Sequence, residues 1–301
     1  MVKPMINETS HTPRLAPIIW FLAITFIATF SVEFALIQNG VRFGEEVIQS
    51  SPALWLLATM WIPGLAGLLV AKFVEGASLK GLVDSLSLRM GSIGPYLLTM
   101  IIAPLAFAAM YVLSWAFGLT SPDMTMQTLT AVTGSTEPIT QKTVFQLMLP
   151  LSIILGPIIN FVFGLGEEIG WRGFLLPRLM VLGKTKAYVL LGILWGLWHA
   201  PLIWVGFNYP GHPVSGIAMM CVLSTAFGLF INEMTLHYRS SLLAAFIHGA
   251  VNAQGYGIWF WLFPGVNPLL GGGTGLTAIA VWLVVGIATM KILSRLQPNT
   301  I

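Results

Sequence analysis

Long apolar runs separated by short polar segments dominate the pattern of this chain. A transmembrane helix needs about 20 consecutive apolar residues, and the polar breaks divide the sequence into runs of about that length. Runs this long exceed a buried strand, so they predict membrane-spanning helices. The eight predicted spans are 15–37, 52–71, 93–118, 143–166, 187–207, 214–233, 240–262 and 275–293.

A proline and two glycines interrupt two of these spans. Pro201 lacks the N–H that would continue the helix, so we expect a kink in the fifth span just past His199. Gly255 and Gly257 weaken the end of the seventh span. The fourth span is expected to continue as helix beyond residue 166, towards Pro177.

The composition excludes a soluble protein. Hydrophobic residues make up 56% of the 301 positions and charged residues only 8%, whereas soluble globular domains contain about 25% charged residues. We therefore predict an all-α polytopic membrane protein with about eight transmembrane helices. The net charge of +3 is too small to indicate nucleic-acid binding, and the single cysteine, Cys221, excludes an internal disulfide or a cysteine-based zinc site.

The basic residues predict the orientation of a single transmembrane domain. We place this domain at 15–293, with its motif core at 143–255, a cytoplasmic N-terminal tail at 1–14 and a cytoplasmic C-terminal tail at 294–301. With both termini in the cytoplasm, all but Arg42 and Lys142 of the 14 lysines and arginines lie in cytoplasmic segments. The expected location is a prokaryotic plasma membrane, as an integral multi-pass protein.

Ionisable residues within the predicted spans mark a candidate site, because charge in hydrocarbon is costly and usually functional. At about 1.5 Å per residue, the groups on spans four, five and seven lie roughly 15, 18 and 12 Å from the cytoplasmic ends. Similar depths let them converge on one cavity in the inner half of the membrane, whereas Glu33 is expected nearer the outer side, away from them. The converging residues are Glu167, Glu168, Arg172, His199, His248 and Asn252.

Helical spacing separates the two glutamates. Arg172 follows Glu168 by four residues, so the two share a helix face and can form an ion pair. Glu167 is rotated by about 100° from Glu168 and is freer to face the cavity as a general base. The alternative is that the glutamates only form a packing ion pair with Arg172.

Two further pairs share helix faces at the same spacing. His248 lies four residues before Asn252, and Trp195 four residues before His199. Gly196 lies near the His199 face, where a small residue lets another helix come close. A histidine in a membrane can also be a satisfied core residue, and Trp195 is interpreted as packing or cavity wall. Polar groups at one depth on three helices favour a functional site.

Together these motifs resemble the CPBP family of intramembrane proteases, also called the Abi family, which contains CAAX prenyl proteases and bacteriocin-processing enzymes. The three motifs cover residues 143–255 and lie on separate predicted helices. The chain departs from the family at Trp195, where phenylalanine is more common. The motifs in order are Glu167-Glu168-x-x-x-Arg172, Trp195-x-x-x-His199 and His248-x-x-x-Asn252.

The resemblance implies an all-helical fold with a conical cavity open to the cytoplasm, and it implies a role for each residue. Glu167 would activate water, His199 would orient that water, and His248 with Asn252 would stabilise the oxyanion. The supporting residues would be Glu168, Arg172 and Trp195.

The residues leave the role of a metal open. If zinc binds, its ligands would be His199, His248 and Glu167, since catalytic zinc usually has three protein ligands. The sequence contains no His-Glu-x-x-His motif, and using Glu167 as a ligand would remove the base. A metal-free, glutamate-dependent hydrolase is therefore favoured over a zinc metalloprotease.

Three functions are compatible with this pattern. The first is an intramembrane endopeptidase that cleaves near the cytoplasmic face, with membrane lipid around it and a peptide or protein as substrate. That substrate would be a lipidated C-terminus or a bacteriocin-like peptide. The second is a proton- or cation-coupled transporter that uses the Glu/His cluster as a relay. The third is a non-catalytic membrane scaffold.

Overall fold

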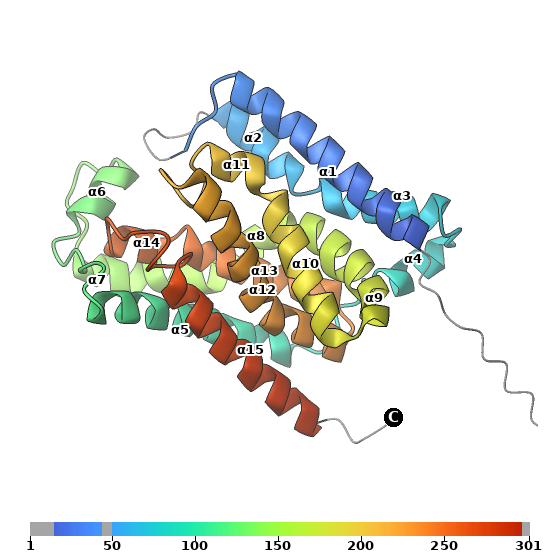
Figure 1. Ribbon diagram of the computed structural model, residues 1–301. Helices are drawn as coiled ribbons and strands as arrows, with labels where there is room; N and C mark the ends of the chain where they lie inside the picture. Colours follow the sequence, from blue (N-terminus) through green and yellow to red (C-terminus); the bar gives the residue numbers. More distant parts are fainter. Residues whose placement is uncertain (1–14, 44–49, 297–301) are drawn as a thin grey trace, which may run out of the picture.

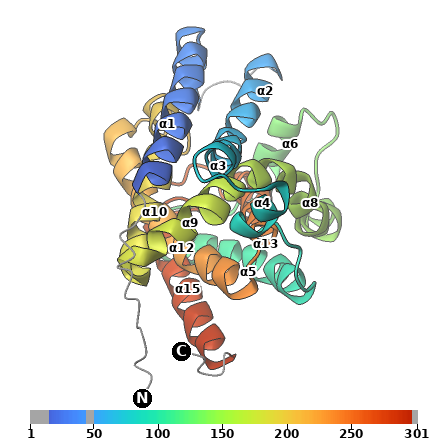
Figure 2. The same ribbon diagram turned by 90° about the vertical axis from the view of Figure 1, so that its right-hand side faces the viewer.

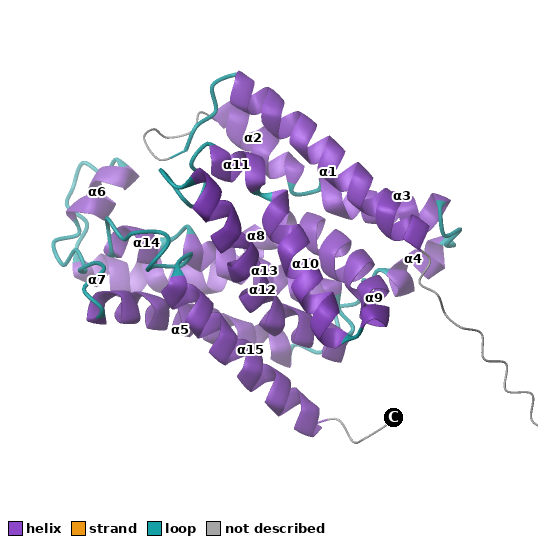
Figure 3. Ribbon diagram, viewed as in Figure 1, coloured by secondary structure: helices purple, strands orange, loops and turns teal. Residues whose placement is uncertain are grey.

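The computed structural model describes residues 15–43 and 50–296, and every regular element in these ranges is a helix (Figures 1 and 3). The predicted all-α fold class is therefore confirmed for the described part of the chain. The predicted tail 1–14 and residues 297–301 of the C-terminal tail lie outside these ranges. Residues 294–296, which were assigned to that tail, are the last residues of the final helix.

The elements differ widely in length, and the longest helical stretch is built from several of them. They are α1 (Leu15–Gln38), α2 (Ser50–Thr59), α3 (Ile62–Phe73), α4 (Leu79–Ser85), α5 (Gly94–Ala116), α6 (Gln127–Thr133), α7 (Gln141–Thr143), the π-helical turn η1 (Val144–Met148), α8 (Leu149–Glu168), the π-helical turn η2 (Ile169–Leu175), α9 (Leu176–Leu179), the 3₁₀ turn η3 (Met180–Leu182), α10 (Lys184–Trp198), α11 (Ala200–Trp204), α12 (Pro213–Tyr238), α13 (Ser241–Gly255), α14 (Ile258–Leu262) and α15 (Leu276–Leu296).

Six helical stretches of the described chain are long and apolar enough to cross a membrane. This confirms a polytopic membrane protein, but it does not confirm the predicted count of eight spans. The predicted segments 187–207 and 240–262 contain no such helix. The six stretches are Leu15–Gln38, Leu54–Phe73, Gly94–Ala116, Gln141–Leu182, Pro213–Tyr238 and Leu276–Leu296.

The two segments that fall short are broken helices. Each contains a helix of 15 residues, α10 and α13, which is about 22 Å at 1.5 Å per residue and shorter than the hydrocarbon core of about 30 Å. Helix α10 ends at His199, and α11 restarts with Pro201 in its first turn. The kink predicted just past His199 is thus a helix end, while the fourth predicted span does continue as helix to Leu182.

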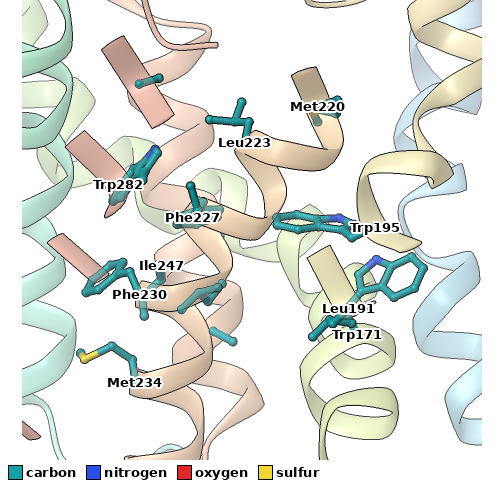
Figure 4. Packing of buried hydrophobic residues seen from close by; sticks show 14 of the residues in the cluster. Trp171, Leu191, Trp195, Met220, Leu223, Phe227, Phe230, Met234, Ile247 and Trp282 are labelled. Carbon is teal, nitrogen blue, oxygen red and sulfur yellow. The ribbon is translucent and has the colours of Figure 1, made fainter. Parts of the chain in front are cut away.

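The broken helices lie inside the molecule. Helices α1, α2 and α3 lie above, α5 and α15 lie below, and α8, α10, α12 and α13 lie between them (Figures 1 and 2). Buried aromatic side chains fill the space between α10, α12 and α15, where Trp195 packs on Phe227 and Phe227 on Trp282 (Figure 4). The two candidate histidines, His199 at the end of α10 and His248 on α13, are therefore buried in protein.

Glycines bring the backbones of α8 and α13 into contact. A Cβ added at Gly249 would lie 2.8 Å from the Phe161 nitrogen and 2.9 Å from the Pro157 oxygen. One added at Gly164 would lie 2.8 Å from the Ala245 oxygen. Small residues at such crossings allow close helix packing in membranes. This crossing places the end of α8, with its glutamates, against the His248 turn of α13.

Glycines act in the same way on the other helices of the site. A Cβ at Gly196 of α10 would lie 2.5 Å from the Cys221 Cα on α12, which confirms the close approach predicted at that position. A Cβ at Gly170 of η2 would lie 2.5 Å from the backbone of Pro63 on α3. The glutamate-bearing helix is thus held between α3 and α13.

Candidate active site

The two glutamates end α8 and are followed at once by the π-helical turn η2. Glu167 is 2% exposed, Glu168 is 0% exposed and Arg172 is 1% exposed. π-Helical turns are rare and frequently occur at functional sites. The chain therefore buries three ionisable side chains at a place where its longest described helical stretch, Gln141–Leu182, departs from α-helical geometry.

Glu168 forms the ion pair that its spacing predicts. Its Oε1 accepts from Arg172 Nη1 at 2.9 Å and from His248 Nδ1 at 2.8 Å. Arg172 also donates from Nε to Asn232 Oδ1 at 3.1 Å, and its guanidinium lies 4.1 Å from the centre of a Trp195 ring. These contacts fix the Arg172 side chain between three helices.

Glu167 faces a different set of groups. Its Oε2 accepts from Trp195 Nε1 at 2.8 Å, and its carboxyl group interacts electrostatically with His248, Glu168 and Arg172. Its Oε1 makes no hydrogen bond to the described residues. Trp195 is therefore more than a packing or wall residue, because it fixes one oxygen of the candidate base, which phenylalanine could not do.

His199 lies at the end of α10, next to Trp195. Its Nδ1 contacts the Trp195 carbonyl oxygen at 2.8 Å, and because a carbonyl can only accept, Nδ1 carries the hydrogen. The neutral ring therefore has an acceptor at Nε2. Phe207 stacks on the ring at 6.2 Å with an interplanar angle of 6°, and Trp198 contacts its edge at 4.9 Å. The ring orientation is thus determined on three sides.

His248 is brought into the same cluster, whereas Asn252 lies at its edge. The His248 ring packs against Trp195 at 5.4 Å and is 6% exposed. Asn252 lies one turn further along α13, is partly exposed, and makes no side-chain hydrogen bond to the described residues. Three of the predicted catalytic residues, Glu167, His199 and His248, therefore contact Trp195. The Asn252 amide makes no hydrogen bond to the described residues and is free for another partner.

The described residues do not form the zinc site that the sequence left open. No group of three or more histidine, cysteine, aspartate or glutamate side chains is arranged there to hold a metal ion. Glu167 Oε2 and His199 Nδ1 contact Trp195, and His248 Nδ1 contacts Glu168. The side chains of His199, His248 and Glu167 are therefore not gathered into a three-ligand zinc site in the described part of the chain.

Two residues of the site were missed or misplaced by sequence reasoning. Asn232, 0% exposed on α12, accepts the Arg172 hydrogen bond. The only signal in the sequence is an amide at the end of an apolar run. Glu33 was expected away from the cluster, and this is wrong. It is 0% exposed and interacts electrostatically with Glu167.

The predicted conical cavity open to the cytoplasm stays a prediction, as do the orientation of the termini and the prokaryotic location. An apolar hollow of about 570 Å³ lies between α5 and α15, and none of the candidate site residues lines it. The polar cluster is nearly closed by its own side chains, since its members are at most 9% exposed apart from Asn252.

The fold and the cluster together define a class, namely polytopic helical membrane proteins with a buried glutamate–histidine site at the ends of broken helices. Comparison of the sequence with known protein families identifies a more specific group within this class. Residues 148–254 match the family model of type II CAAX prenyl endopeptidases, described as Rce1-like. The resemblance predicted from the three motifs is therefore confirmed, because the matched residues contain all three of them.

A curated relative supports the same assignment. The chain is 34% identical over 93 residues to the CAAX prenyl protease 2 of Methanococcus maripaludis. The similarity covers 29% of this chain and 34% of that protein, so the chain spans about a third of the length of the curated relative that it matches.

Proposed function

We propose that this chain is an intramembrane endopeptidase of the CAAX-protease type, in which Glu167 activates water for attack on a peptide carbonyl. The observation that carries the proposal is the asymmetry of the Glu167 carboxylate. Trp195 fixes Oε2 at 2.8 Å, while Oε1 makes no hydrogen bond to the described residues. A general base needs this combination of a fixed orientation and a free acceptor.

His199 supports the same water. With its hydrogen on Nδ1, the neutral ring presents Nε2 as an acceptor. One water molecule can then donate one hydrogen to Glu167 and the other to His199. Its lone pair remains free to attack the carbonyl carbon. As the C–O bond forms, Glu167 takes the proton and the carbonyl oxygen becomes an oxyanion.

His248 and Asn252 would stabilise this oxyanion. Because His248 already donates from Nδ1 to Glu168, it can also donate from Nε2 only as an imidazolium. Glu168 stabilises that cation at 2.8 Å, and the positive charge of Arg172 balances the negative charge of Glu167. The cluster of two carboxylates, one guanidinium and one imidazolium is then neutral. Asn252 adds an uncharged amide donor, and such donors are worth most in a site that excludes water.

The proposed substrate is a peptide or protein that reaches the site from the membrane. The name of the matched relative, CAAX prenyl protease 2, suggests a peptide with a prenylated cysteine near its C-terminus. Cleavage at the cytoplasmic side is part of the proposal, in line with the basic segments expected there. The proposed chemistry uses no metal, because it assigns the free Glu167 Oε1 and His199 Nε2 to the reacting water.

The test uses the purified full chain in lipid vesicles and a fluorogenic peptide that ends in a farnesylated cysteine followed by three residues. The same peptide without the farnesyl group is the second probe. We expect the wild type to cleave the farnesylated peptide. Glu167→Gln should reduce kcat by about 10²- to 10⁴-fold, which is the usual contribution of a general base to the rate. Glu137→Gln, at an exposed loop position, is the matched control.

Three outcomes separate the possibilities. Equal cleavage by wild type and Glu167→Gln would refute the catalytic role. Cleavage of both peptides at the same rate would support the peptidase activity but would refute a requirement for a prenylated substrate. Loss of activity after exhaustive chelation, with recovery on adding zinc, would contradict the metal-free chemistry.

A further inference from the structure

A single buried face of α1 leads to the candidate site. Its buried residues recur every four positions, which places them on one side of the helix. Near the start of this face, Phe21 stacks on Phe174 of η2 at 4.9 Å. Further along, Thr29 Oγ1 accepts from Trp198 Nε1 at 2.9 Å, and Trp198 precedes His199. The face therefore follows η2 and reaches the end of α10, where the site lies.

Glu33 is the last member of this face and lies one helical turn beyond Thr29. It is 0% exposed, and neither of its carboxyl oxygens has a hydrogen-bond partner among the described residues. Its carboxyl group interacts electrostatically with that of Glu167. An apolar residue would fill this position without loss of hydration, so packing alone does not explain a glutamate there.

The charges around Glu33 determine its protonation state. Arg172, the guanidinium of this cluster, already contacts Glu168, Asn232 and Trp195. With His248 also paired to Glu168, both cations of the cluster are in use, and no described residue donates to Glu33. A third carboxylate beside this neutral cluster would have no counterion, and carboxyl groups in that situation commonly share one proton. Trp195 donates to Glu167 Oε2 and so stabilises the carboxylate there, whereas no donor contacts Glu33, so Glu33 holds the proton while Glu167 is the carboxylate.

We propose that Glu33 is the general acid of the site, and this inference rests on the proposed peptidase function. In the first step Glu167 takes a proton from water as the new C–O bond forms. In the second step the C–N bond breaks, and Glu33 gives its proton to the departing amine nitrogen. The products are a carboxylic acid and an amine. A proton then passes from Glu167 to Glu33, which restores both groups.

The substitution Glu33→Gln tests this role, because it keeps the shape of the neutral carboxyl group but removes the transferable proton. We expect kcat for the farnesylated peptide to fall about 100-fold, at the lower end of the usual worth of a general acid. KM should change less than about twofold, because kcat measures the chemical step when binding is not altered. Glu33→Asp keeps the acid on a shorter side chain and should lie between Glu33→Gln and wild type.

A second substrate separates acid catalysis from a structural role. In the 4-nitrophenyl ester of the farnesylated cysteine peptide, the leaving phenolate needs no proton. Glu33→Gln should hydrolyse this ester at a rate within about threefold of wild type, because only the amide depends on the acid. Equal losses on ester and amide, or an unchanged amide rate, would overturn the inference.

These outcomes are distinguishable from failure of the proposed function. If wild type does not cleave, or if Glu167→Gln is as active as wild type, the peptidase itself is refuted. If Glu167→Gln is inactive while Glu33→Gln cleaves the amide normally, only the role of Glu33 is refuted. If Glu33→Gln does not fold, Glu33→Asp is tested instead. Its rate of ester hydrolysis relative to amide hydrolysis should then exceed that of wild type, and an equal ratio would overturn the inference.

Discussion

Replacing Arg172 by methionine removes the cation that holds the glutamate pair while keeping a long apolar side chain. The change leaves Glu168, at 0% exposure, with only the His248 contact. It also leaves the buried Asn232 oxygen without its donor. Breaking a buried ion pair costs about 3–5 kcal/mol, and an unsatisfied buried acceptor about 1–3 kcal/mol. The free energy of unfolding should therefore fall by about 4–8 kcal/mol, within the total stability of many proteins.

The double variant distinguishes an ion-pair effect from lost packing. Adding Glu168→Gln to Arg172→Met removes the stranded charge and should recover at least about 2 kcal/mol relative to the sum of the single changes. The assay is unfolding in mixed micelles with increasing sodium dodecyl sulfate, followed by tryptophan fluorescence. Arg89→Met is the control, because the Arg89–Asp84 pair is exposed and such pairs contribute at most about 1 kcal/mol. Strictly additive losses in the double variant would refute this account of the pair.

Two further predictions concern packing and pH. Gly249→Ala should separate α8 from α13 and lower both stability and peptidase activity, because the new Cβ meets backbone atoms at 2.8 and 2.9 Å. Gly228→Ala, whose Cβ would lie 3.6 Å from Asn232 Nδ2, is the matched control, and equal effects in the unfolding assay would contradict the packing argument. Hydrogen bonds from Thr125 and Thr128 lower the pKa of Asp123 to about 2. The ionised Asp123 should therefore stabilise the folded protein fully at a pH above its ordinary pKa of 3.8, and this stabilisation should disappear as the pH falls towards 2. The protection factors of amides in the Asp123 loop, which correct hydrogen exchange for its intrinsic pH dependence, should fall over that range in wild type, whereas in Asp123→Asn they should stay constant.

The sequence was sufficient for the features that depend on local spacing. Apolar run length predicted a helical membrane protein, the four-residue interval predicted the Glu168–Arg172 pair, and Gly196 predicted a close helix contact. Features that depend on how distant helices pack were not predictable. Nothing near residue 33 indicates that α1 crosses the end of α10, so Glu33 was placed by depth alone. Nothing near residue 195 indicates that the indole N–H reaches Glu167.

The predicted count of eight spans is not confirmed because two of the predicted spans are broken helices, and both breaks lie next to candidate site residues. A length criterion assumes one continuous helix per crossing, but α10 stops at His199 and α13 stops at Gly255, three residues after Asn252. Backbone at a helix end has unpaired polar groups, which a membrane tolerates only where protein or water covers them. A hydrolase needs water at that depth. Trp195, which holds the proposed base, and His199 lie at the end of α10, and Asn252 lies in the last turn of α13. We therefore infer that the helix ends provide the polar surroundings that the reacting water requires, so that restoring a continuous helix at residues 199–201 would remove activity before it removed the fold. The test is Pro201→Ala, for which peptide cleavage should fall while unfolding in mixed micelles stays near wild type, and parallel losses in both assays would contradict this reasoning.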